Sequence, residues 1–378
     1  MLLTIIESYP SKENIYANGF VHMRQKKYIE FGVDSKVFLL CKEKKHDYIY
    51  EGVQVICGNS KDLIEYINNE KDVETVFVHF VSSKIISTLK NVKRSIKIVI
   101  FVHGNEALMW YERLFKDRIV DLITLLKFIK YIVVNSLTIL NIRKYFKHVS
   151  NKVEIVTVSE WMKEKTSINW KVNKDIIKVI PNVIDEDTFK FRNIDEEKLC
   201  NILIIKNYSN GKYCCDIIEK IIIKMSCRND FNKYCFTIIG DGILFDKYTR
   251  KIKKYDNVKI HKGFINHKEI AQIHKENAIL LCPTRQDAQG VSMCEGMSSG
   301  LIPITSNSSA IPEYIPKEYN YLLCNNDNIL EFIDNIVNVS SDYKKYKKMS
   351  KNVSNFIRNL CSSEKTIKRE IELINNEK

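Results

Sequence analysis

The stretch RQDAQGVSMCEGMSSGLIPI, residues 285–304, holds two carboxylates eight positions apart, Asp287 and Glu295, with Gly290 between them. It follows the strand-like run AILLCP at 278–283, and its own last residues again suit a strand. We therefore expect a buried strand, a glycine turn, a short helix and a second strand. A plain amphipathic helix needs neither the glycines nor the serines of this stretch. The loop itself is thus a candidate site.

The turn before the expected helix suits an anion. We expect the helix to begin near Ser292, so that its first backbone N–H groups point outward unpaired. These groups and the helix dipole favour a phosphate, which Gly290 lets the backbone approach closely. Glu295, in the first turn, would accept hydrogen bonds from a ribose diol, and Asp287 would reach the hydroxyls of a sugar on the far phosphate. Ser292 and Glu295 also have the spacing of a capping box, in which Glu295 only satisfies the helix start, and this alternative stays open.

Short β-rich runs alternate with helical segments twice along the chain. In the first half these runs are residues 2–7, 35–40, 53–56, 75–80, 97–102 and 131–134. They restart at 201–205, 234–239, 258–261, 278–283, 301–305 and 320–323. The alternation predicts an α/β fold of two Rossmann-like, doubly wound domains facing a central cleft. The expected domains are 1–185 and 200–354, with a linker at 186–199 and a C-terminal helix, about 355–378, that joins the first domain.

Composition places the chain among soluble globular proteins. Of its 378 residues 45% are hydrophobic and 28% charged, and no uninterrupted apolar run approaches the roughly 18–20 residues of a membrane-spanning helix. We expect the start, MLLTIIESYP, to be a buried strand and not a signal peptide. The eleven cysteines include no Cys-x-x-Cys, which favours reduced thiols in the cytosol. The net charge of +13 suggests phosphate-bearing partners, although a general richness in Lys, Ile and Asn explains it equally well.

Further motifs surround this loop in chain order. They are FVHGNE at 101–106, VTVSEWMK at 156–163, PNVIDEDTF at 181–189, IIKNYSNGKYCCDII at 204–218, IIGDGILF at 238–245 and SNSSAIPEYI at 306–315. Lys206 and Lys212 flank a Ser-Asn-Gly loop and could clamp a diphosphate as point charges. In order and spacing these segments resemble the retaining nucleotide-sugar glycosyltransferases of family 4, which have the two-Rossmann GT-B architecture. The resemblance covers most of the chain and is strongest from about 154 to 315.

The resemblance implies a role for each residue that matches a family motif. Asp287 matches the first acid of the family's Glu-x7-Glu motif, which contacts the donor sugar, and Glu295 matches the second, which contacts the nucleotide ribose. His103 matches the active-site histidine, so the catalytic candidates are His103 and Asp287. The other donor-binding matches are the diphosphate loop Gly290, Val291 and Ser292, the cations Lys206 and Lys212, the base pocket Phe264 and Ile265, and Gly19 of the N-terminal loop.

Some positions depart from the family pattern. Asp287 is one methylene shorter than the usual glutamate, and Lys206 replaces an arginine and lacks its bidentate fork. Asn18 replaces the first of two N-terminal glycines, and Ser308-Ser309 replaces a later pair. The resemblance implies that the lysines act at the diphosphate in place of a tightly bound metal. The acids at 185–187 mimic an Asp-x-Asp metal motif, but their Pro-Asn-x-x-Asp context favours a structural role.

The expected function is transfer, with retention of configuration, of a hexose or N-acetylhexosamine to a growing surface glycan of bacterial type, such as capsule or lipopolysaccharide. The expected partners are a nucleotide sugar, first of all a UDP-sugar, as substrate and not cofactor, and a glycan or lipid-linked glycan as acceptor. No nucleic-acid partner is expected, because no recognition module is found. The alternatives are a non-catalytic GT-B subunit that binds acceptor or partner, a nucleotide-sugar epimerase and, least favoured, a basic nucleic-acid binder.

The segment RIVDLITLLKFIKYIVV, residues 118–134, carries an apolar stripe at helical spacing. The stripe consists of Ile119, Leu122, Ile123, Leu126 and Ile129. Basic residues accompany it, namely Lys127, Lys130, Arg143, Lys144 and Lys147. Such a segment either docks on anionic lipid or packs as a core helix with a solvated basic face. We expect a cytoplasmic protein, and the first alternative adds contact with the inner face of the cytoplasmic membrane.

Overall fold

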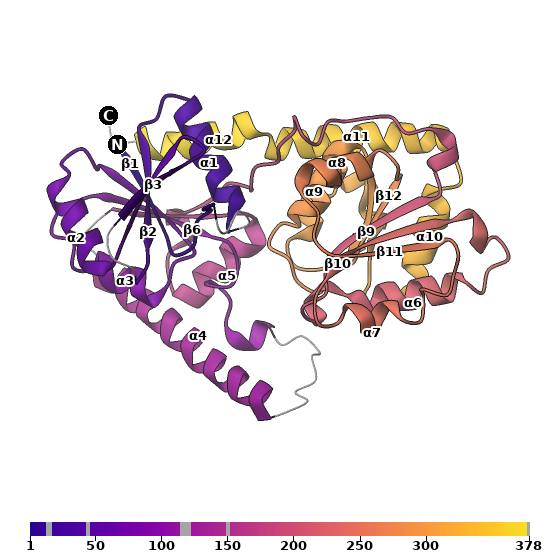
Figure 1. Ribbon diagram of the computed structural model, residues 1–378, viewed down its shortest axis with the longest axis horizontal. Helices are drawn as coiled ribbons and strands as arrows, with labels where there is room; N and C mark the ends of the chain where they lie inside the picture. Colours follow the sequence, from indigo (N-terminus) through magenta and orange to yellow (C-terminus); the bar gives the residue numbers. More distant parts are fainter. Residues whose placement is uncertain (13–16, 43–45, 114–121, 149–151, 376–378) are drawn as a thin grey trace. The chain divides into compact units, whose positions relative to one another are not determined.

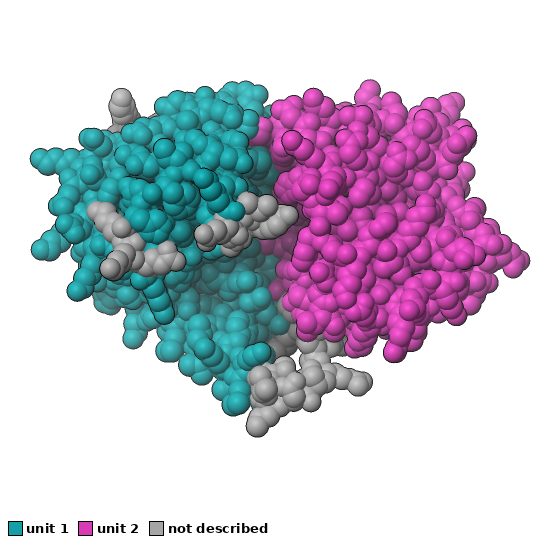
Figure 2. Space-filling model, in the orientation of Figure 1, with its two compact units in different colours: residues 1–114, 119–183, 364–378 teal, residues 115–118, 184–363 magenta. Residues whose placement is uncertain are grey.

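The computed structural model describes residues 1–12, 17–42, 46–113, 122–148 and 152–375. The chain forms two compact units, each built on its own sheet (Figure 1). Unit 1 comprises residues 1–114, 119–183 and 364–378, and unit 2 comprises 115–118 and 184–363 (Figure 2). The segment 186–199, expected as a linker, therefore lies in unit 2, and the division falls between Val183 and Ile184.

Unit 1 contains an eight-stranded sheet with the order β3-β4-β2-β1-β5-β6-β7-β8. Its strands are β1 (Leu2–Ile6), β2 (Ser35–Leu40), β3 (His46–Tyr50), β4 (Val53–Gly58), β5 (Thr75–His79), β6 (Lys97–Val102), β7 (Val153–Thr157) and β8 (Ile177–Val179). Neighbouring strands pair parallel, except that β3 runs antiparallel to β4 at the edge. The central strands are buried along their whole length, as expected for a parallel sheet covered on both faces.

The helices of unit 1 connect its strands, except α12, which is the last helix of the chain. They are α1 (Gly19–Glu30), α2 (Ser60–Asn69), α3 (Ser83–Leu89), α4 (Leu122–His148), α5 (Glu160–Trp170) and most of α12 (Ser363–Asn375), with short 3-10 turns at Trp110–Arg113 and Lys174–Ile176. Side-chain caps begin several of them: Asn59 forms a capping box with Asp62, and Ser159 accepts the N–H of Met162. The local sequence thus sets where these helices start.

The strand predicted at 131–134 is wrong, because these residues lie in the middle of α4. The run YIVV is rich in β-branched residues, but neither glycine nor proline interrupts the sequence on either side, and the helix continues for 27 residues. A short apolar run does not by itself distinguish a strand from a helix. Along one side, α4 packs on unit 1 through buried residues, namely Asn135, Ile139, Ile142 and Tyr145.

The outer side of α4 is apolar and exposed. In the part of the chain that the structure describes, one helix is long and apolar enough by length and composition to cross a membrane, namely Leu125–His148. Only 17% of its most apolar window is buried. Its exposed apolar residues are Leu125, Leu126, Ile129, Val133, Val134, Leu137 and Leu140. Two residues of the predicted stripe, Leu126 and Ile129, are thus exposed. The side chains of the other three, Ile119, Leu122 and Ile123, lie outside the described residues.

Unit 2 contains a six-stranded parallel sheet with the order β11-β10-β9-β12-β13-β14. Its strands are β9 (Asn201–Asn207), β10 (Cys235–Asp241), β11 (Val258–Lys262), β12 (Ile279–Cys282), β13 (Ile302–Ser306) and β14 (Leu323–Cys324). Its helices are α6 (Cys215–Met225), α7 (Phe245–Thr249), α8 (His267–His274), α9 (Val291–Ser299), α10 (Ile329–Val339) and α11 (Tyr343–Cys361). The strand expected at 320–323 starts later than predicted, because a 3-10 segment, Lys317–Leu322, occupies most of that range.

The order of the strands in unit 2 reverses at β9. From β9 the chain moves outward to β10 and β11 on one side, and then returns to β12 on the other side of β9. The loops that follow β9 and β12 therefore leave the carboxyl edge of the sheet at its topological switch point. Ligands of open α/β sheets bind at this position. Both loops carry predicted site residues.

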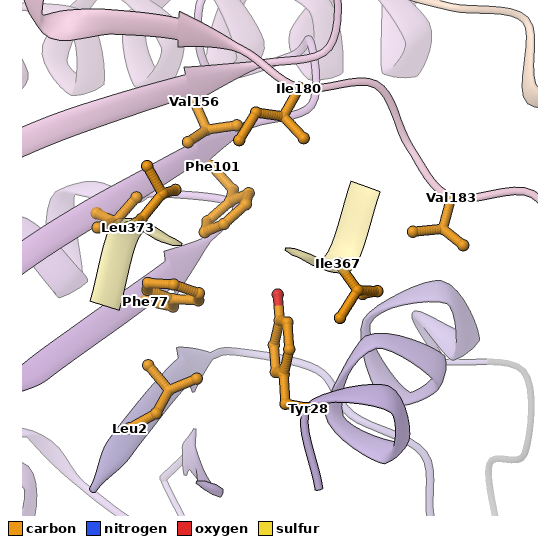
Figure 3. Packing of buried hydrophobic residues seen from close by; sticks show 10 residues of the cluster. Leu2, Tyr28, Phe77, Phe101, Val156, Ile180, Val183, Ile367 and Leu373 are labelled. Atoms are coloured by element: carbon orange, nitrogen blue, oxygen red, sulfur yellow. The ribbon is translucent and has the colours of Figure 1, made fainter. Parts of the chain in front are cut away.

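The C-terminal helix α12 belongs to the core of unit 1. Ile367 and Leu373 lie beside Tyr28 and Phe77 in one buried cluster (Figure 3). Glu370 is fully buried and accepts hydrogen bonds from Arg24 Nε at 3.0 Å and from the Tyr28 hydroxyl at 2.6 Å. Arg24 also donates to the side-chain oxygen of Asn182 at 3.0 Å. The chain thus returns to complete unit 1 with its last helix.

Candidate functional site

The start of α9 presents free backbone N–H groups, as expected from the sequence. The helix begins at Val291, and its first hydrogen bond to a backbone carbonyl is that of Cys294 to Gly290 at 3.0 Å. Among the described residues, no acceptor pairs with the N–H groups of Val291, Ser292 and Met293. Three amides and the positive end of the helix dipole therefore converge on one point, which is favourable for phosphate.

The capping box considered for Ser292 and Glu295 does not form. Gly290 is the N-cap of α9, and no side chain caps the helix. Ser292 is then the second helical residue and is exposed, and Glu295 is the fifth, one residue beyond the first turn in which it was expected. This result removes the structural explanation for the spacing of Ser292 and Glu295.

Gly290 shapes the turn that leads into α9. Its φ of +74° lies in the left-handed region, and a Cβ at this position would meet Cδ1 of Ile311 at 2.9 Å. Its N–H donates to Oδ1 of Asp287 at 2.8 Å. Gly290 therefore turns the chain and packs against Ile311, and its amide is already paired. The amide of Met293 takes its place among the unpaired ones.

Asp287 holds the loop in shape with one of its oxygens. Oδ1 accepts the N–H groups of Gln289 at 3.2 Å and Gly290 at 2.8 Å. Among the described residues no partner pairs with Oδ2, and the side chain is only half-buried. Asp287 thus stabilises the turn into α9 through one carboxylate oxygen. Its second oxygen is available to a ligand hydroxyl.

Glu295 is a buried carboxyl group without a hydrogen-bond donor among the described residues. Burial, and secondly the charge of Asp185, raise the pKa of Glu295 to about 8. Asp185 itself accepts hydrogen bonds from the N–H of Asp187 and from the N–H and hydroxyl of Thr188, which ties it into a local turn. A buried carboxyl group gains most from a ligand that supplies hydroxyl donors.

Lys206 lies near the end of β9, and Lys212 lies in the 3-10 turn Gly211–Tyr213 that follows this strand. Lys206 is half-buried at the end of the strand, and no carboxylate pairs with it in the described part of the chain. Burial raises the pKa of the Cys282 thiol, at the end of β12, while the charge of Lys206 acts to lower it, so the ammonium group lies near the switch point. Lys212 lies over the ring of Tyr213 with its Nζ 5.3 Å from the ring centre.

A pair that the sequence analysis missed connects the two loops. Arg285 forms a fork with Asp216, with Nη1–Oδ1 at 2.9 Å and Nη2–Oδ2 at 2.7 Å, and Nη1 also donates to the carbonyl of Gly211. The N–H of Arg285 donates to the carbonyl of Lys212 at 2.9 Å. The loop with the lysines is thus fixed against the loop that leads into α9. The available signals in the sequence were an arginine three residues after β12 and an acid in the first turn of α6.

The Gly-Asp-Gly sequence at the end of β10 lets the chain lie close to the end of β9 and the residues that follow it. A Cβ on Gly240 would lie 2.0 Å from the carbonyl oxygen of Lys206, and one on Gly242, with φ +140°, would lie 2.4 Å from the backbone of Tyr208. Only glycine fits at either position. The close approach supports the backbone of the segment that carries Lys206.

Phe264 and Ile265, predicted to contact the base, follow β11 at the same edge of the sheet. The side chain of Phe264 is 71% exposed, and Ile265 is half-buried. An exposed aromatic ring on a short loop offers a stacking surface for a flat base.

In unit 1, His103 follows β6 and pairs with His79. Nε2 of His103 lies 2.9 Å from Nδ1 of His79, and the two rings stack with their centres 5.2 Å apart. Burial, and secondly Arg24, lower the pKa of His103 to about 3, so the imidazole is neutral at pH 7. The N–H of His103 donates to Glu106 at 2.7 Å, which fixes the turn after the strand.

Gly19 lies in the same unit, at the start of α1. Asn18 precedes it in the left-handed region and donates to the carbonyl of Ser8 at 2.8 Å. Space beside Gly19 is open in the described part of the chain, where no atom lies within 4 Å of a Cβ built there. The ring of the next residue, Phe20, lies 5.1 Å from that of His103. The structure thus brings Gly19 and His103 to neighbouring positions in unit 1, and Lys206, Lys212 and the α9 loop to neighbouring positions in unit 2.

Residues 185–356 match the family model of glycosyl transferases group 1. The chain is 26% identical over 185 residues to an uncharacterised 41.2 kDa protein in the cps region of Klebsiella pneumoniae, covering 47% of this chain and 49% of that protein. It is 24% identical over 195 residues to the phosphatidylinositol N-acetylglucosaminyltransferase GPI3 subunit of Saccharomyces cerevisiae, covering 49% and 42%. The chain thus spans half or less of the length of these two curated relatives.

Solved structures share the fold over nearly the whole chain. A glycosyltransferase from Rickettsia africae superposes with a TM-score of 0.70 at 14% identity, covering 98% of this chain and 97% of that one. The Anabaena protein HepE in complex with UDP and glucose gives a TM-score of 0.69 at 11% identity, covering 99% of both chains. The two-domain α/β fold with parallel sheets is therefore that of the GT-B glycosyltransferases, as predicted.

Proposed function

We propose that this protein is a retaining glycosyltransferase that moves a hexose or N-acetylhexosamine from a nucleotide diphosphate sugar, most readily a UDP-sugar, to a growing surface glycan. The observation that carries the proposal is the start of α9, where the N–H groups of Val291, Ser292 and Met293 are unpaired among the described residues. Asp287 precedes these three residues in the chain, and Glu295 follows them. The family match and a fold shared with a protein that binds UDP and glucose support the same function.

The chemistry follows from where charge develops. Transfer separates an anionic diphosphate from an electron-poor anomeric carbon, so negative charge grows on the leaving phosphate in the transition state. The α9 amides, Lys206 and Lys212 would stabilise this charge selectively, since they are fixed before the reaction. These cations make a tightly bound metal unnecessary in this proposal. Glu295 would hold the ribose diol and Phe264 the base.

Asp287 and His103 would act on the donor sugar. Oδ2 of Asp287 is available for a sugar hydroxyl while Oδ1 keeps the loop in place. His103, neutral at pH 7, would donate or accept a hydrogen bond without carrying charge into the reaction. Oδ1 of Asp287 is already hydrogen-bonded to the loop, so only Oδ2 is available to the donor sugar. A non-catalytic subunit that binds a ligand but does not transfer a sugar is therefore the second candidate.

We further propose that the protein works in the cytoplasm and that α4 lies on anionic lipid, next to a lipid-linked glycan acceptor. Seven apolar side chains of α4 are exposed, while the opposite side is docked on unit 1 through residues such as Asn135, whose amide donates to the carbonyl of Leu108 at 3.0 Å. Exposed lysines, Lys127, Lys130, Lys144 and Lys147, accompany the stripe. A docked helix of this kind suits the plane of the membrane interface.

A ligand panel tests the proposed function. The melting temperature of the full chain is measured with UDP, GDP and ADP and with their sugars. A nucleotide present at about 100 times its Kd stabilises the folded chain by about 2.7 kcal/mol, which raises the melting temperature by several degrees. Release of UDP from a UDP-sugar then separates an enzyme from a binding subunit, and the anomeric proton of the product, observed by NMR, reports retention. If no nucleotide stabilises the chain, the proposal fails.

A further inference from the structure

Unit 1 contains a cavity of about 680 Å³ at the edge of its sheet, and His103 is not among its lining residues. Its polar and aromatic lining includes Glu7, Ser8, Tyr9, His46, Tyr48 and Tyr50. The volume lies within the usual range for small-molecule sites, about 300–1,000 Å³. None of these residues belongs to the donor site described above.

The position of the cavity is that of a ligand site in an open α/β sheet. Glu7 and Ser8 directly follow β1, and His46 pairs with Cys57 near the end of β4. The cavity therefore lies at the carboxyl edge of the strands, where such folds bind ligands. The antiparallel strand β3 forms one wall. The hairpin of β3 and β4 at the edge of the sheet thus forms the cavity next to the loop that follows β1.

A chain of contacts connects the cavity with the predicted active-site residues of unit 1. Ser8, in the lining, accepts a hydrogen bond at 2.8 Å from Asn18, which directly precedes Gly19. Phe20 follows Gly19, and its ring lies 5.1 Å from that of His103. A ligand in the cavity would therefore lie beside the segment that contains Asn18, Gly19 and Phe20, which contacts His103.

The lining has the chemistry that a sugar ring requires. The rings of His46 and Tyr48 stack with their centres 6.4 Å apart and 25° between their planes, which forms a flat aromatic surface on one face of β3. The Tyr48 hydroxyl donates to the carbonyl of Pro10 at 2.9 Å, so this ring is held in place. A pyranose combines an apolar C–H face, which packs on an aromatic plane, with a rim of hydroxyl groups.

The polar groups of the cavity match that rim. Glu7 and Ser8 are exposed at the edge, and among the described residues no cation pairs with the carboxylate of Glu7. Tyr9, deeper in, shares a hydrogen bond of 2.8 Å with Nδ1 of His22. Among the described lining residues there is one lysine, Lys12, and one carboxylate, Glu7, so this part of the lining carries no cluster of positive charge that would select a phosphate. Neutral hydroxyls are therefore a better match than an anion.

We propose that this cavity binds a saccharide ring of the acceptor. The inference rests on the proposed function for its biological meaning, but saccharide binding by unit 1 does not require the donor site of unit 2. The cavity, its position at the carboxyl edge, the aromatic surface and the contact with the Gly19 loop carry it together.

Saturation-transfer NMR on the full chain tests the proposal, with the methyl glycosides of glucose, galactose and N-acetylglucosamine as probes. At least one glycoside is expected to receive saturation, most strongly on the C–H face. His46→Ala removes half of the aromatic surface, and Glu7→Gln removes the charged acceptor. Each is expected to weaken the binding of that glycoside about tenfold, which corresponds to about 1.4 kcal/mol. Both side chains are exposed, so the variants are expected to fold, and their melting temperatures verify this.

Phe31→Ala is the matched control, since it removes an exposed ring, 43% accessible, at the far end of α1 from Gly19. Saturation of no glycoside, or equal saturation in wild type, His46→Ala and Glu7→Gln, overturns the proposal. Binding of UDP at the cavity in place of a sugar also overturns it. Stabilisation of the wild-type chain by UDP is measured in the same samples. Its absence, with glycoside binding retained, would count against the proposed function and not against the cavity.

Discussion

Arg285 and Asp216 form a bidentate ion pair between the two loops of the switch point in unit 2, with the nitrogen–oxygen distances of 2.9 and 2.7 Å. The pair fixes the spacing between the segment that carries Lys206 and Lys212 and the turn into α9. Arg285 also binds the carbonyl groups of Gly211 and Lys212, so the contact does not rest on charge alone. Neither residue is proposed to contact the donor. Both would hold in position the groups that do contact it, namely Lys206, Lys212 and the turn into α9.

Breaking this pair is expected to weaken donor binding. Asp216→Ala should raise the Kd for UDP about fivefold, because a partly buried pair is worth about 1 kcal/mol and its loss lets the lysine loop move. The double variant with Arg285→Asp and Asp216→Arg should recover part of the affinity. Isothermal calorimetry measures these constants. Arg228→Ala is the control, since Arg228 and Asp230 form a similar fork in the turn after α6. Equal affinities in wild type and Asp216→Ala would contradict the positioning role.

Glu295 is expected to make stability depend on pH. Burial raises its pKa to about 8 in the folded chain, whereas the unfolded carboxyl titrates near 4.5. The folded state therefore binds more protons than the unfolded state between these values, and stability falls as pH rises from about 5 to about 8. Glu295→Gln removes this loss and should be more stable than wild type at pH 8 by up to a few kcal/mol, with little difference at pH 4.5.

Urea denaturation at the two pH values measures this difference. Glu318→Gln, at an exposed position of the same unit, is the control for the substitution itself. A wild type that is as stable as Glu295→Gln at pH 8 would show that the carboxyl group is not buried without a donor.

His103 is expected to contribute to turnover but not to its pH dependence. Its pKa of about 3 keeps the imidazole neutral from pH 5 to 8, so the rate should show no ionisation of this group in that range. Loss of one positioned hydrogen-bonding group in His103→Ala should lower kcat by about 100-fold. His148→Ala, an exposed histidine of unit 1, is the control. A rate-controlling ionisation near pH 6.5 that disappears in His103→Ala would contradict the neutral form.

The exposed side of α4 is expected to determine binding to lipid. Val133→Glu with Leu137→Glu places two charges in the middle of the stripe, where the side chains are 50% and 54% exposed, and should abolish co-sedimentation with vesicles that contain phosphatidylglycerol. Ile168→Glu, on α5 and 60% exposed, changes an apolar residue outside the stripe and should have no effect. Equal co-sedimentation of the double variant and wild type would remove α4 from the membrane proposal.

Removing Glu370 is expected to destabilise unit 1. Glu370→Ala leaves the buried guanidinium group of Arg24 without its carboxylate, which costs about 3–5 kcal/mol in comparable buried pairs. Glu364→Ala, which removes an exposed pair with Lys368, should cost less than about 1 kcal/mol. Differential scanning calorimetry follows the unfolding of the chain. Similar melting temperatures for the two variants would show that α12 does not complete the core.

Local patterns predicted the parallel sheets and the turn into α9, because short buried strands and a glycine before a helix leave a signal within a few residues. The same signals misled at 131–134, where an apolar β-branched run is part of a long helix. Strand β3 was missed, although Glu51 and Gly52, with φ of +44° and +85°, form a two-residue hairpin turn between polar and apolar residues. In the sequence, only Gly52 of this pair indicates a turn.

Pairs of residues far apart in the chain could not be predicted from one sequence. Arg24 and Glu370 are separated by 346 positions, and Asp216 and Arg285 by 69. No local periodicity in the sequence indicates that two such residues pair. Many other acidic and basic residues of the chain could equally have been their partners. The packing of Gly290 against Ile311 could not be predicted for a similar reason, since Ile311 belongs to a later turn.

A crystal structure of the chain with a UDP-sugar tests the central claim most directly. We predict diphosphate oxygens within about 2.7–3.2 Å of the amide nitrogens of Val291, Ser292 and Met293, the ribose diol at Glu295 and the sugar at the second oxygen of Asp287. A nucleotide bound elsewhere on the chain, with these three amides facing only water, would contradict it.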